Sequence, residues 1–254
     1  MSWAGTGDAY AASYAALCAG TGERLRALAS TAEGRSLIDV GSGDGRLAAA
    51  WADAGWQVTA AEPEPSMRAA ASRQHPDLAL VDATLPSLPF DDGAFDVVIA
   101  NFVLNHLADP RAGAAELHRV ARQVAIATTW TASSSFWADV TAQAGLTPAQ
   151  GGRLPADKDF ERTASGFDRM LRDVGWQPDV TELTWTWLPR AEALWQSVEG
   201  GVAGAGAFYT ALGAAERDRF RSAFDEIIEE RAEDGTIRHV QTAAIAVDQL
   251  HGRA

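Results

Sequence analysis

The chain has 254 residues and a formal net charge of −13, and its length suffices for one α/β domain with insertions and a full core. The negative charge argues against binding of nucleic acid or of an anionic membrane surface, because phosphate groups need a basic partner. Five histidines without ligand spacing argue against a metal site. There is no signal-peptide pattern and no apolar run of about 18 residues. The single cysteine, Cys18, suits a reducing compartment, so we expect a cytoplasmic protein.

Strand and helix patterns alternate along the chain after an alanine-rich helical pattern at residues 8–29. The alternation is typical of a doubly wound parallel sheet with helices on both faces. Predicted strands cover residues 36–40, 57–61, 78–81, 95–100, 123–129, 180–187 and 240–248, and predicted helices cover residues 45–54, 65–73, 110–121, 163–174 and 215–233.

A glycine-rich turn follows the first predicted strand, which ends near Asp39. Glycine stands at every second position, at Gly41, Gly43 and Gly45, and glycine takes positive φ without steric cost. The following helix points free N–H groups and its positive dipole end into the turn. The turn therefore predicts a pocket for an anionic or carboxylate-bearing cofactor. Arg46 stands where the dinucleotide fingerprint requires a third glycine.

Polar side chains follow the next three strands. Glu62 ends the second strand about 20 residues after the turn, where an acid binds ribose hydroxyls in such folds. A carboxylate can accept both hydroxyl protons, although a solvated acid at a strand end is the simpler alternative. The third strand ends at Asp82 and the fourth runs into Asn101.

These motifs together resemble the class I S-adenosylmethionine-dependent methyltransferases. The matching segments are Asp39–Gly45, Glu62, Asp82–Ala83, residues 88–98 and residues 101–110. The resemblance spans about residues 34–130 and is closest to the small-molecule branch that includes quinone-biosynthesis enzymes. It implies a Rossmann-like, seven-stranded sheet that is mostly parallel with one antiparallel strand. It also implies S-adenosylmethionine as the cofactor, with binding residues Tyr14, Asp39, Gly41, Ser42, Gly43, Glu62, Pro63, Met67, Asp82, Ala83, Asn101, Phe102 and His106.

The resemblance also implies a role for several of these residues. The turn glycines line the methionine part, Glu62 holds the ribose and Asp82 meets the adenine amine. Backbone around Asn101 and Phe102 faces the sulfonium. The chain departs from the family at Asp44, where a small hydroxylated residue is common. Its charge would either repel the cofactor's carboxylate or attract its ammonium, and the sequence leaves both alternatives open.

We expect a single methyltransferase domain over residues 1–254. An N-terminal helical lid covers residues 1–30, with Tyr14 favoured over Tyr10 as its aromatic residue, and the cofactor-binding core covers residues 34–130. Two long connections, 131–160 and 189–235, are predicted to form lid insertions over the acceptor. Connections of this length are usually functional or disordered, and their aromatic content argues against disorder.

Histidine and aromatic residues supply the candidates for catalysis and acceptor binding. His106 follows the fourth strand and is the first candidate for a general base; packing on the cofactor is the alternative, and His239 is a second candidate. Aromatic side chains favour a planar or apolar small molecule, whereas core packing is the alternative for them. The predicted acceptor residues are Trp130, Phe136, Trp137, Trp195, Phe208 and Tyr209.

The sequence thus predicts methyl transfer to a small aromatic or apolar molecule, O-directed as the first hypothesis, in bacterial secondary or quinone-like metabolism. The alternative is a protein that keeps the fold and cofactor but catalyses another reaction, such as a cyclisation, or only binds. A nicotinamide dehydrogenase ranks third because of Arg46. The expected partner is a small molecule, and a homodimer is left open.

Overall fold

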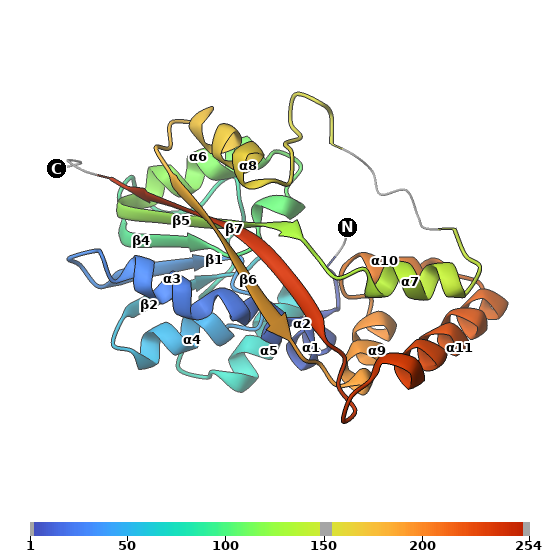
Figure 1. The fold of residues 1–254 in the computed structure, drawn as a ribbon. Helices are drawn as coiled ribbons and strands as arrows, with labels where there is room; N and C mark the ends of the chain where they lie inside the picture. Colours follow the sequence, from blue (N-terminus) through green and yellow to red (C-terminus); the bar gives the residue numbers. More distant parts are fainter. Residues whose placement is uncertain (1–2, 148–153, 251–254) are drawn as a thin grey trace.

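The computed structural model describes residues 3–147 and 154–250. Its centre is a seven-stranded sheet in the order β3-β2-β1-β4-β5-β7-β6, shown in Figure 1. Strand β7 runs antiparallel to both of its neighbours, and the other pairs are parallel. The predicted α/β fold with one antiparallel strand is therefore confirmed. The strands are β1 Ser36–Val40, β2 Gln57–Ala61, β3 Ala79–Val81, β4 Phe95–Ala100, β5 Ala121–Ala132, β6 Asp179–Trp187 and β7 His239–Gln249.

Helices cover both faces of the sheet, with α6 and α8 on one face and α3, α4 and α5 on the other (Figure 1). Within the described residues, no helix is both long and apolar enough to cross a membrane. The helices are α1 Gly7–Ala12, α2 Tyr14–Cys18, α3 Gly22–Ala29, α4 Arg46–Asp53, α5 Pro65–Gln74, α6 Pro110–Val120, α7 Phe136–Gln143, α8 Ala164–Arg172, α9 Ala191–Glu199, α10 Ala203–Ala211 and α11 Ala214–Arg231, with 3₁₀ turns η1 Ala19–Thr21 and η2 Leu104–His106.

Local sequence explains where the helices next to the site begin. Helix α6 has proline at its first position, and the Asp109 carboxylate accepts a hydrogen bond from the Ala112 N–H at 3.1 Å. Helix α5 has the same arrangement, with Pro65 preceded by Glu64 as the capping residue. Proline tolerates the first helical turn, and a capping oxygen satisfies an otherwise unpaired N–H. Both helices therefore begin close to the positions that the sequence predicts.

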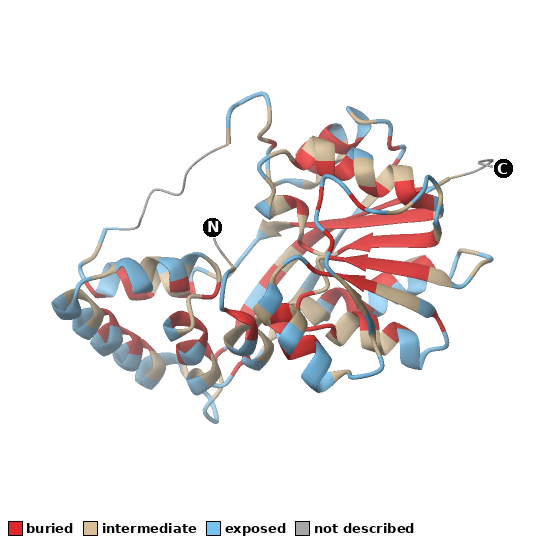
Figure 2. Cartoon of the chain, turned by 180° about the vertical axis from the view of Figure 1, so that it is seen from behind, coloured by how far each residue is buried: buried red, intermediate tan, exposed pale blue. Residues whose placement is uncertain are grey.

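The central strands β1, β4, β5 and β7 are buried on both faces, as is typical of a sheet with helices on both sides. Successive residues of β1 point to opposite sides. Ile38 and Val40 pack towards α6 and α8, whereas Leu37 packs towards α3 and α4. Figure 2 shows the buried strands enclosed by helices that are exposed on their outer faces. This rigid centre fixes the positions of the loops at its carboxyl edge.

A helical cap, formed by α7, α9, α10 and α11, lies beside the carboxyl edge of the sheet (Figure 1). Helix α7 follows β5, and the other three connect β6 to β7. Because β6 is parallel to β5, both connections leave the same edge of the sheet. The cap has an apolar core of its own, separate from the two clusters that flank the sheet. Positions 148–153 of the first insertion lie outside the described residues.

The helical pattern at residues 8–29 forms several short elements instead of one helix. The helix is interrupted at Ser13, which has the non-helical dihedral angles φ −134° and ψ −87°. The Ser13 hydroxyl donates a hydrogen bond to the Ala9 carbonyl. Helix α1 contacts both α5 and α9, and the Gly7 N–H donates to Ser66 Oγ at 3.1 Å. The N-terminal segment thus connects the sheet layer to the cap. Tertiary contacts override the alanine-rich helical pattern at this break.

Candidate functional site

The glycine-turn site consists of Asp39–Gly45 together with Glu62 and Asn101. The Gly41 and Ser42 N–H groups both donate to the Ala61 carbonyl, at 2.7 and 3.1 Å, which ties the turn to β2. Gly41 has φ +71° and Gly43 has φ +58°. A Cβ on Gly43 would lie 2.9 Å from Tyr10 Cε1. Glycine is therefore required by backbone conformation and by the close approach of a neighbour.

Glu62 joins the turn to the end of β2. Its side chain is buried, and its two carboxylate oxygens accept hydrogen bonds from the Gly43 and Glu64 N–H groups, each at 2.9 Å. Burial raises the pKa of Glu62, and the two hydrogen bonds act in the opposite direction. Each oxygen keeps a lone pair that can accept from a ligand hydroxyl. Glu62 is thus held in place with unused acceptor capacity.

A narrow cavity of about 20 Å³ opens between the turn, α1, α2 and Asn101. Two polar side-chain atoms of the turn, Ser42 Oγ and Asp44 Oδ2, are buried without a hydrogen-bond partner among the described residues. Buried polar groups normally have such partners. Burial, together with the neighbouring acids Glu62 and Asp44, raises the pKa of Asp39 to about 7. The turn therefore presents unsatisfied polar atoms and buried negative charge to the cavity.

The end of β4 is held rigidly by a polar network. Asn101 Oδ1 accepts hydrogen bonds from the Thr21 and Thr128 hydroxyls, at 3.0 and 2.8 Å. Its Nδ2 donates to the Cys18 carbonyl at 3.0 Å, which ties the N-terminal segment to the sheet edge. Phe102 has φ +61°, and its N–H donates to Thr128 Oγ1 at 2.8 Å. A non-glycine residue in this conformation is strained, and such strain concentrates at functional sites.

The remaining predicted cofactor residues lie around the ends of β2 and β3. Met67 and Ala83 are buried, whereas Pro63 and Asp82 are exposed. Asp82 is paired with Arg68 at 2.9 Å, and the other end of the same guanidinium donates to the Glu62 carbonyl at 2.7 Å. Arg68 thus connects the exposed Asp82 carboxylate to the backbone of Glu62 and fixes its orientation.

His106 ends the 3₁₀ turn η2, and its ring lies 5.1 Å from the Trp3 ring in an edge-on arrangement. The residue as a whole is exposed, while partial loss of solvent around the imidazole lowers its pKa to about 4. The imidazole is therefore neutral at neutral pH and can accept a proton, although it is a weak base. His239 lies elsewhere, between the rings of Phe136 and Trp187.

The predicted acceptor residues divide between two places. Trp130 lies at the end of β5, where its ring stacks on Phe102 with centroids 3.8 Å apart and planes 5° apart. The other five belong to the cap, where they pack around Phe220 and Phe224. These five are Phe136, Trp137, Trp195, Phe208 and Tyr209. Only Trp130 is beside the segment that follows β4, so an acceptor role for the cap aromatics stays a prediction.

The structure places Tyr10, rather than Tyr14, on the glycine turn. The Tyr10 ring is the nearest neighbour of Gly43. Tyr14 faces the cap, where its hydroxyl accepts a hydrogen bond from Trp137 Nε1 at 2.9 Å. In a continuous helix the two tyrosines, four residues apart, would lie on the same face. The interruption of the helix at Ser13 turns them towards different parts of the molecule.

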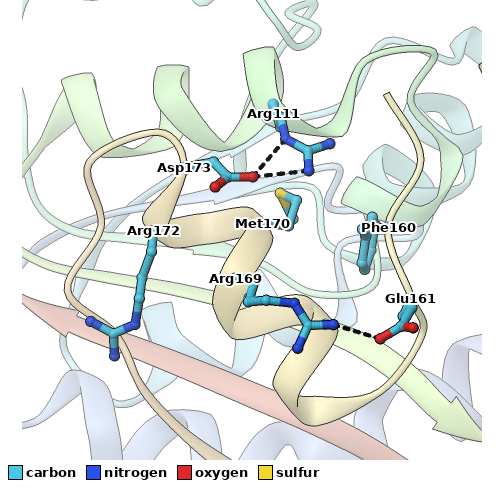
Figure 3. Close-up of a pocket in the computed structure, with 8 residues that line it drawn as sticks. Arg111, Phe160, Glu161, Arg169, Met170, Arg172 and Asp173 are labelled. Atoms are coloured by element: carbon cyan, nitrogen blue, oxygen red, sulfur yellow. Dashed lines mark hydrogen bonds and ion pairs between the residues drawn. The ribbon is translucent and has the colours of Figure 1, made fainter. Parts of the chain in front are cut away.

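A second groove, of about 360 Å³, lies between α6 and α8 and shares no lining residue with the first cavity. Figure 3 shows its arginines engaged with acids: Arg111 pairs with Asp173 at 2.9 Å and Arg169 with Glu161 at 2.6 Å. Arg172 pairs with Asp168 at 2.9 Å. Among the described residues that line the groove, every arginine is thus paired with an acid and none is free for an anionic ligand. The described part of the chain also contains no cluster of side chains suited to a metal ion.

Comparison with known proteins agrees with this geometry. The family model for a methyltransferase domain matches residues 38–127. Demethylmenaquinone methyltransferase of Beutenbergia cavernae is 37% identical over 89 residues, which are 35% of this chain and 37% of that protein. The chain spans about half or less of the length of the curated relatives it matches.

Solved structures show the same fold. A putative methyltransferase from an antibiotic biosynthesis pathway of Anabaena variabilis is similar with a TM-score of 0.59 and 18% identity, over 91% of this chain and 97% of that one. The [4+2]-cyclase SpnF is similar with a TM-score of 0.51 and 20% identity, over 91% and 82%. At these identities the likeness extends to the fold alone.

Proposed function

We propose that this chain, whose residues 38–127 match the family model for a methyltransferase domain, transfers a methyl group from S-adenosylmethionine to a small molecule. The observation that carries the proposal is the glycine-turn site. The glycine turn lies against buried Glu62, whose carboxylate has spare acceptor capacity. The turn itself carries two polar atoms, Ser42 Oγ and Asp44 Oδ2, without a hydrogen-bond partner among the described residues. A nucleoside with an amino-acid end supplies hydroxyls and charged groups for these atoms.

In this proposal each part of the site holds one part of the cofactor. Glu62 accepts hydrogen bonds from the ribose hydroxyls, the turn contacts the methionine end, and Asp82 with Ala83 meets the adenine. The cavity beside the turn holds little more than one water molecule, which needs roughly 10–15 Å³. Helix α1 must therefore move away from the turn when the cofactor enters.

The bound cofactor supplies an electrophilic methyl group on a sulfonium sulfur. The task of the protein is to align an acceptor with that methyl, and positioning can contribute up to about 7–11 kcal/mol. The rigid end of β4 around Asn101 suits this task. The N-terminal segment places Tyr10 beside the turn and Trp3 beside His106, and its closure over a bound cofactor would shield the reacting groups from water.

The acceptor is proposed to be a planar or apolar molecule that presents a hydroxyl oxygen. Trp130 and Phe102 provide aromatic surface at the sheet edge. His106 is neutral above a pH of about 4, so it can take the proton that a hydroxyl loses on methylation. A base with a pKa near the working pH contributes roughly 10²–10⁴-fold to a rate, and a weak base such as His106 contributes less.

The test is to incubate the protein with S-adenosylmethionine and a panel of phenols and quinols, followed by mass spectrometry. The expected result is S-adenosylhomocysteine together with an acceptor heavier by one methyl group. Cofactor binding without S-adenosylhomocysteine formation would contradict the proposal. A product of unchanged mass, formed only with the cofactor present, would support the alternative of a cyclisation.

A further inference from the structure

Asp44 is a buried acid whose carboxylate is only partly satisfied. The residue is 3% exposed, and it lines the cavity beside the glycine turn. Its Oδ1 accepts a long hydrogen bond from the Arg46 N–H at 3.3 Å, while its Oδ2 has no hydrogen-bond partner among the described residues. An isolated buried carboxylate is costly, so this oxygen is suited to a donor that comes from a ligand.

The cation nearest to Asp44 does not fill that role. Arg46 Nη2 lies 3.5 Å from Oδ2, beyond good hydrogen-bonding distance, and the arginine side chain is 40% exposed. The same Nη2 donates to the Ala11 carbonyl of α1 at 3.2 Å. The guanidinium is thus shared with a segment that must move when a ligand enters.

The surrounding charge also favours a cation. Asp39 and Glu62 are buried near Asp44, and each carries a pKa raised by burial. Two of these acids, Asp39 and Asp44, line the cavity together with half-exposed Arg46, and His75 is the other basic side chain that acts on the Asp44 charge. Next to Asp44, Ser42 Oγ is buried and unpartnered and can donate to a carboxylate. The turn thus offers an acceptor for a cation and a donor for an anion two residues apart.

We propose that Asp44 binds the α-ammonium group of the cofactor's methionine moiety and so selects ligands with a zwitterionic amino-acid end. A sulfonium cannot donate a hydrogen bond, whereas an ammonium has three donors for the unpartnered oxygen. This inference rests on the proposed function. Of the two effects that the sequence leaves open for Asp44, the inference favours attraction of the ammonium over repulsion of the carboxylate.

The experiment is isothermal titration of wild type and Asp44→Asn with two ligands. The ligands are S-adenosylhomocysteine and its deaminated analogue, in which hydrogen replaces the α-amino group. Wild type should prefer S-adenosylhomocysteine by about 10- to 100-fold, the value of one charge-assisted hydrogen bond. Asp44→Asn should lose most of this preference. Asp53→Asn, at an exposed position at the end of helix α4, which follows the turn, should keep it.

The possible outcomes separate the two proposals. If wild type binds neither ligand, the proposed function fails. If wild type binds both equally, or if Asp44→Asn keeps the full preference, the Asp44 inference is wrong while the proposed function stands. Should Asp44→Asn fail to fold, Arg46→Gln removes the competing guanidinium at a half-exposed position. Its preference for S-adenosylhomocysteine should rise, and a fall would overturn the inference.

Discussion

The glycine-turn site and the helical cap both bury aromatic or charged side chains, but they do so in opposite ways. The site buries three acids, and two polar atoms of the turn have no hydrogen-bond partner in the described part of the chain. The cap buries aromatic rings against one another, for example Trp137 and Phe220 with centroids 6.1 Å apart. Buried charge without partners lowers stability and so indicates a ligand site, whereas stacked rings stabilise a core. The aromatic content of the insertions is therefore first a packing signal.

The comparison predicts its largest effect in the cap. Phe220 is fully buried in the cap core, so Phe220→Ala should lower the free energy of unfolding by about 3–5 kcal/mol through loss of buried area and a cavity. The affinity for S-adenosylhomocysteine should not change. Urea denaturation and titration measure the two quantities, and half-buried Phe208→Ala is the control with a smaller loss. A weaker affinity in folded Phe220→Ala would show that the two regions are coupled.

At the glycine turn we expect a substitution to reduce cofactor affinity more than stability. Gly43→Val should reduce S-adenosylhomocysteine affinity by more than about 100-fold, because a side chain clashes where Tyr10 and the ligand approach. Gly55→Val is the matched control, since Gly55 also has positive φ, at +86°, but has open space around it. Both variants should lose similar stability, and only the first should lose affinity. Equal affinity in the two would remove the turn from the site.

Asp39→Asn separates stability from binding. The folded pKa of Asp39, about 7, lies above its ordinary value of 3.8, so the charged form is disfavoured in the fold. Stability from this residue is complete at low pH and is lost as the pH rises through 7. At about pH 8 the variant should be more stable by up to about 4 kcal/mol and should bind the cofactor more weakly. A variant less stable than wild type at that pH would contradict the burial argument.

The smallest effect is expected at His239, which lies between the cap and the sheet. Burial lowers its pKa from 6.5 to about 4, so the stability it contributes is present above 6.5 and is lost as the pH falls towards 4. Between pH 7 and about pH 5 this loss amounts to about 1–2 kcal/mol. His239→Phe should reduce the pH dependence of unfolding by that amount. An unchanged dependence would show that the imidazole is solvated.

Strands β1, β2 and β4 were predictable because each is a short apolar run followed by a glycine or a polar side chain. Residues 36–40, 57–61 and 95–100 coincide with β1, β2 and β4. Strand β5 extends beyond the predicted 123–129 because it pairs with β7 along most of its length, and a single sequence does not show that pairing. The carboxyl-edge position of Glu62 and Asn101 follows from the alternation of strands and helices.

The parts that sequence reasoning missed depend on tertiary contacts. Nothing in the alanine-rich stretch marks the break at Ser13, so the pattern favours Tyr14 where the structure places Tyr10. The unpartnered oxygen of Asp44 becomes evident only when its neighbours are known. Aromatic residues in a long connection do not reveal whether they face a ligand or each other, as Trp137 and Trp195 show.

The most direct measurement is titration of S-adenosylhomocysteine and of a nicotinamide dinucleotide into wild type and Glu62→Ala. Wild type should bind S-adenosylhomocysteine at one site and should not bind the dinucleotide. Folded Glu62→Ala should bind at least about 10-fold more weakly, because it loses the charge-assisted contacts to the ribose. An unchanged affinity in folded Glu62→Ala, or a preference of wild type for the dinucleotide, would contradict the assignment of the glycine-turn site as the cofactor site.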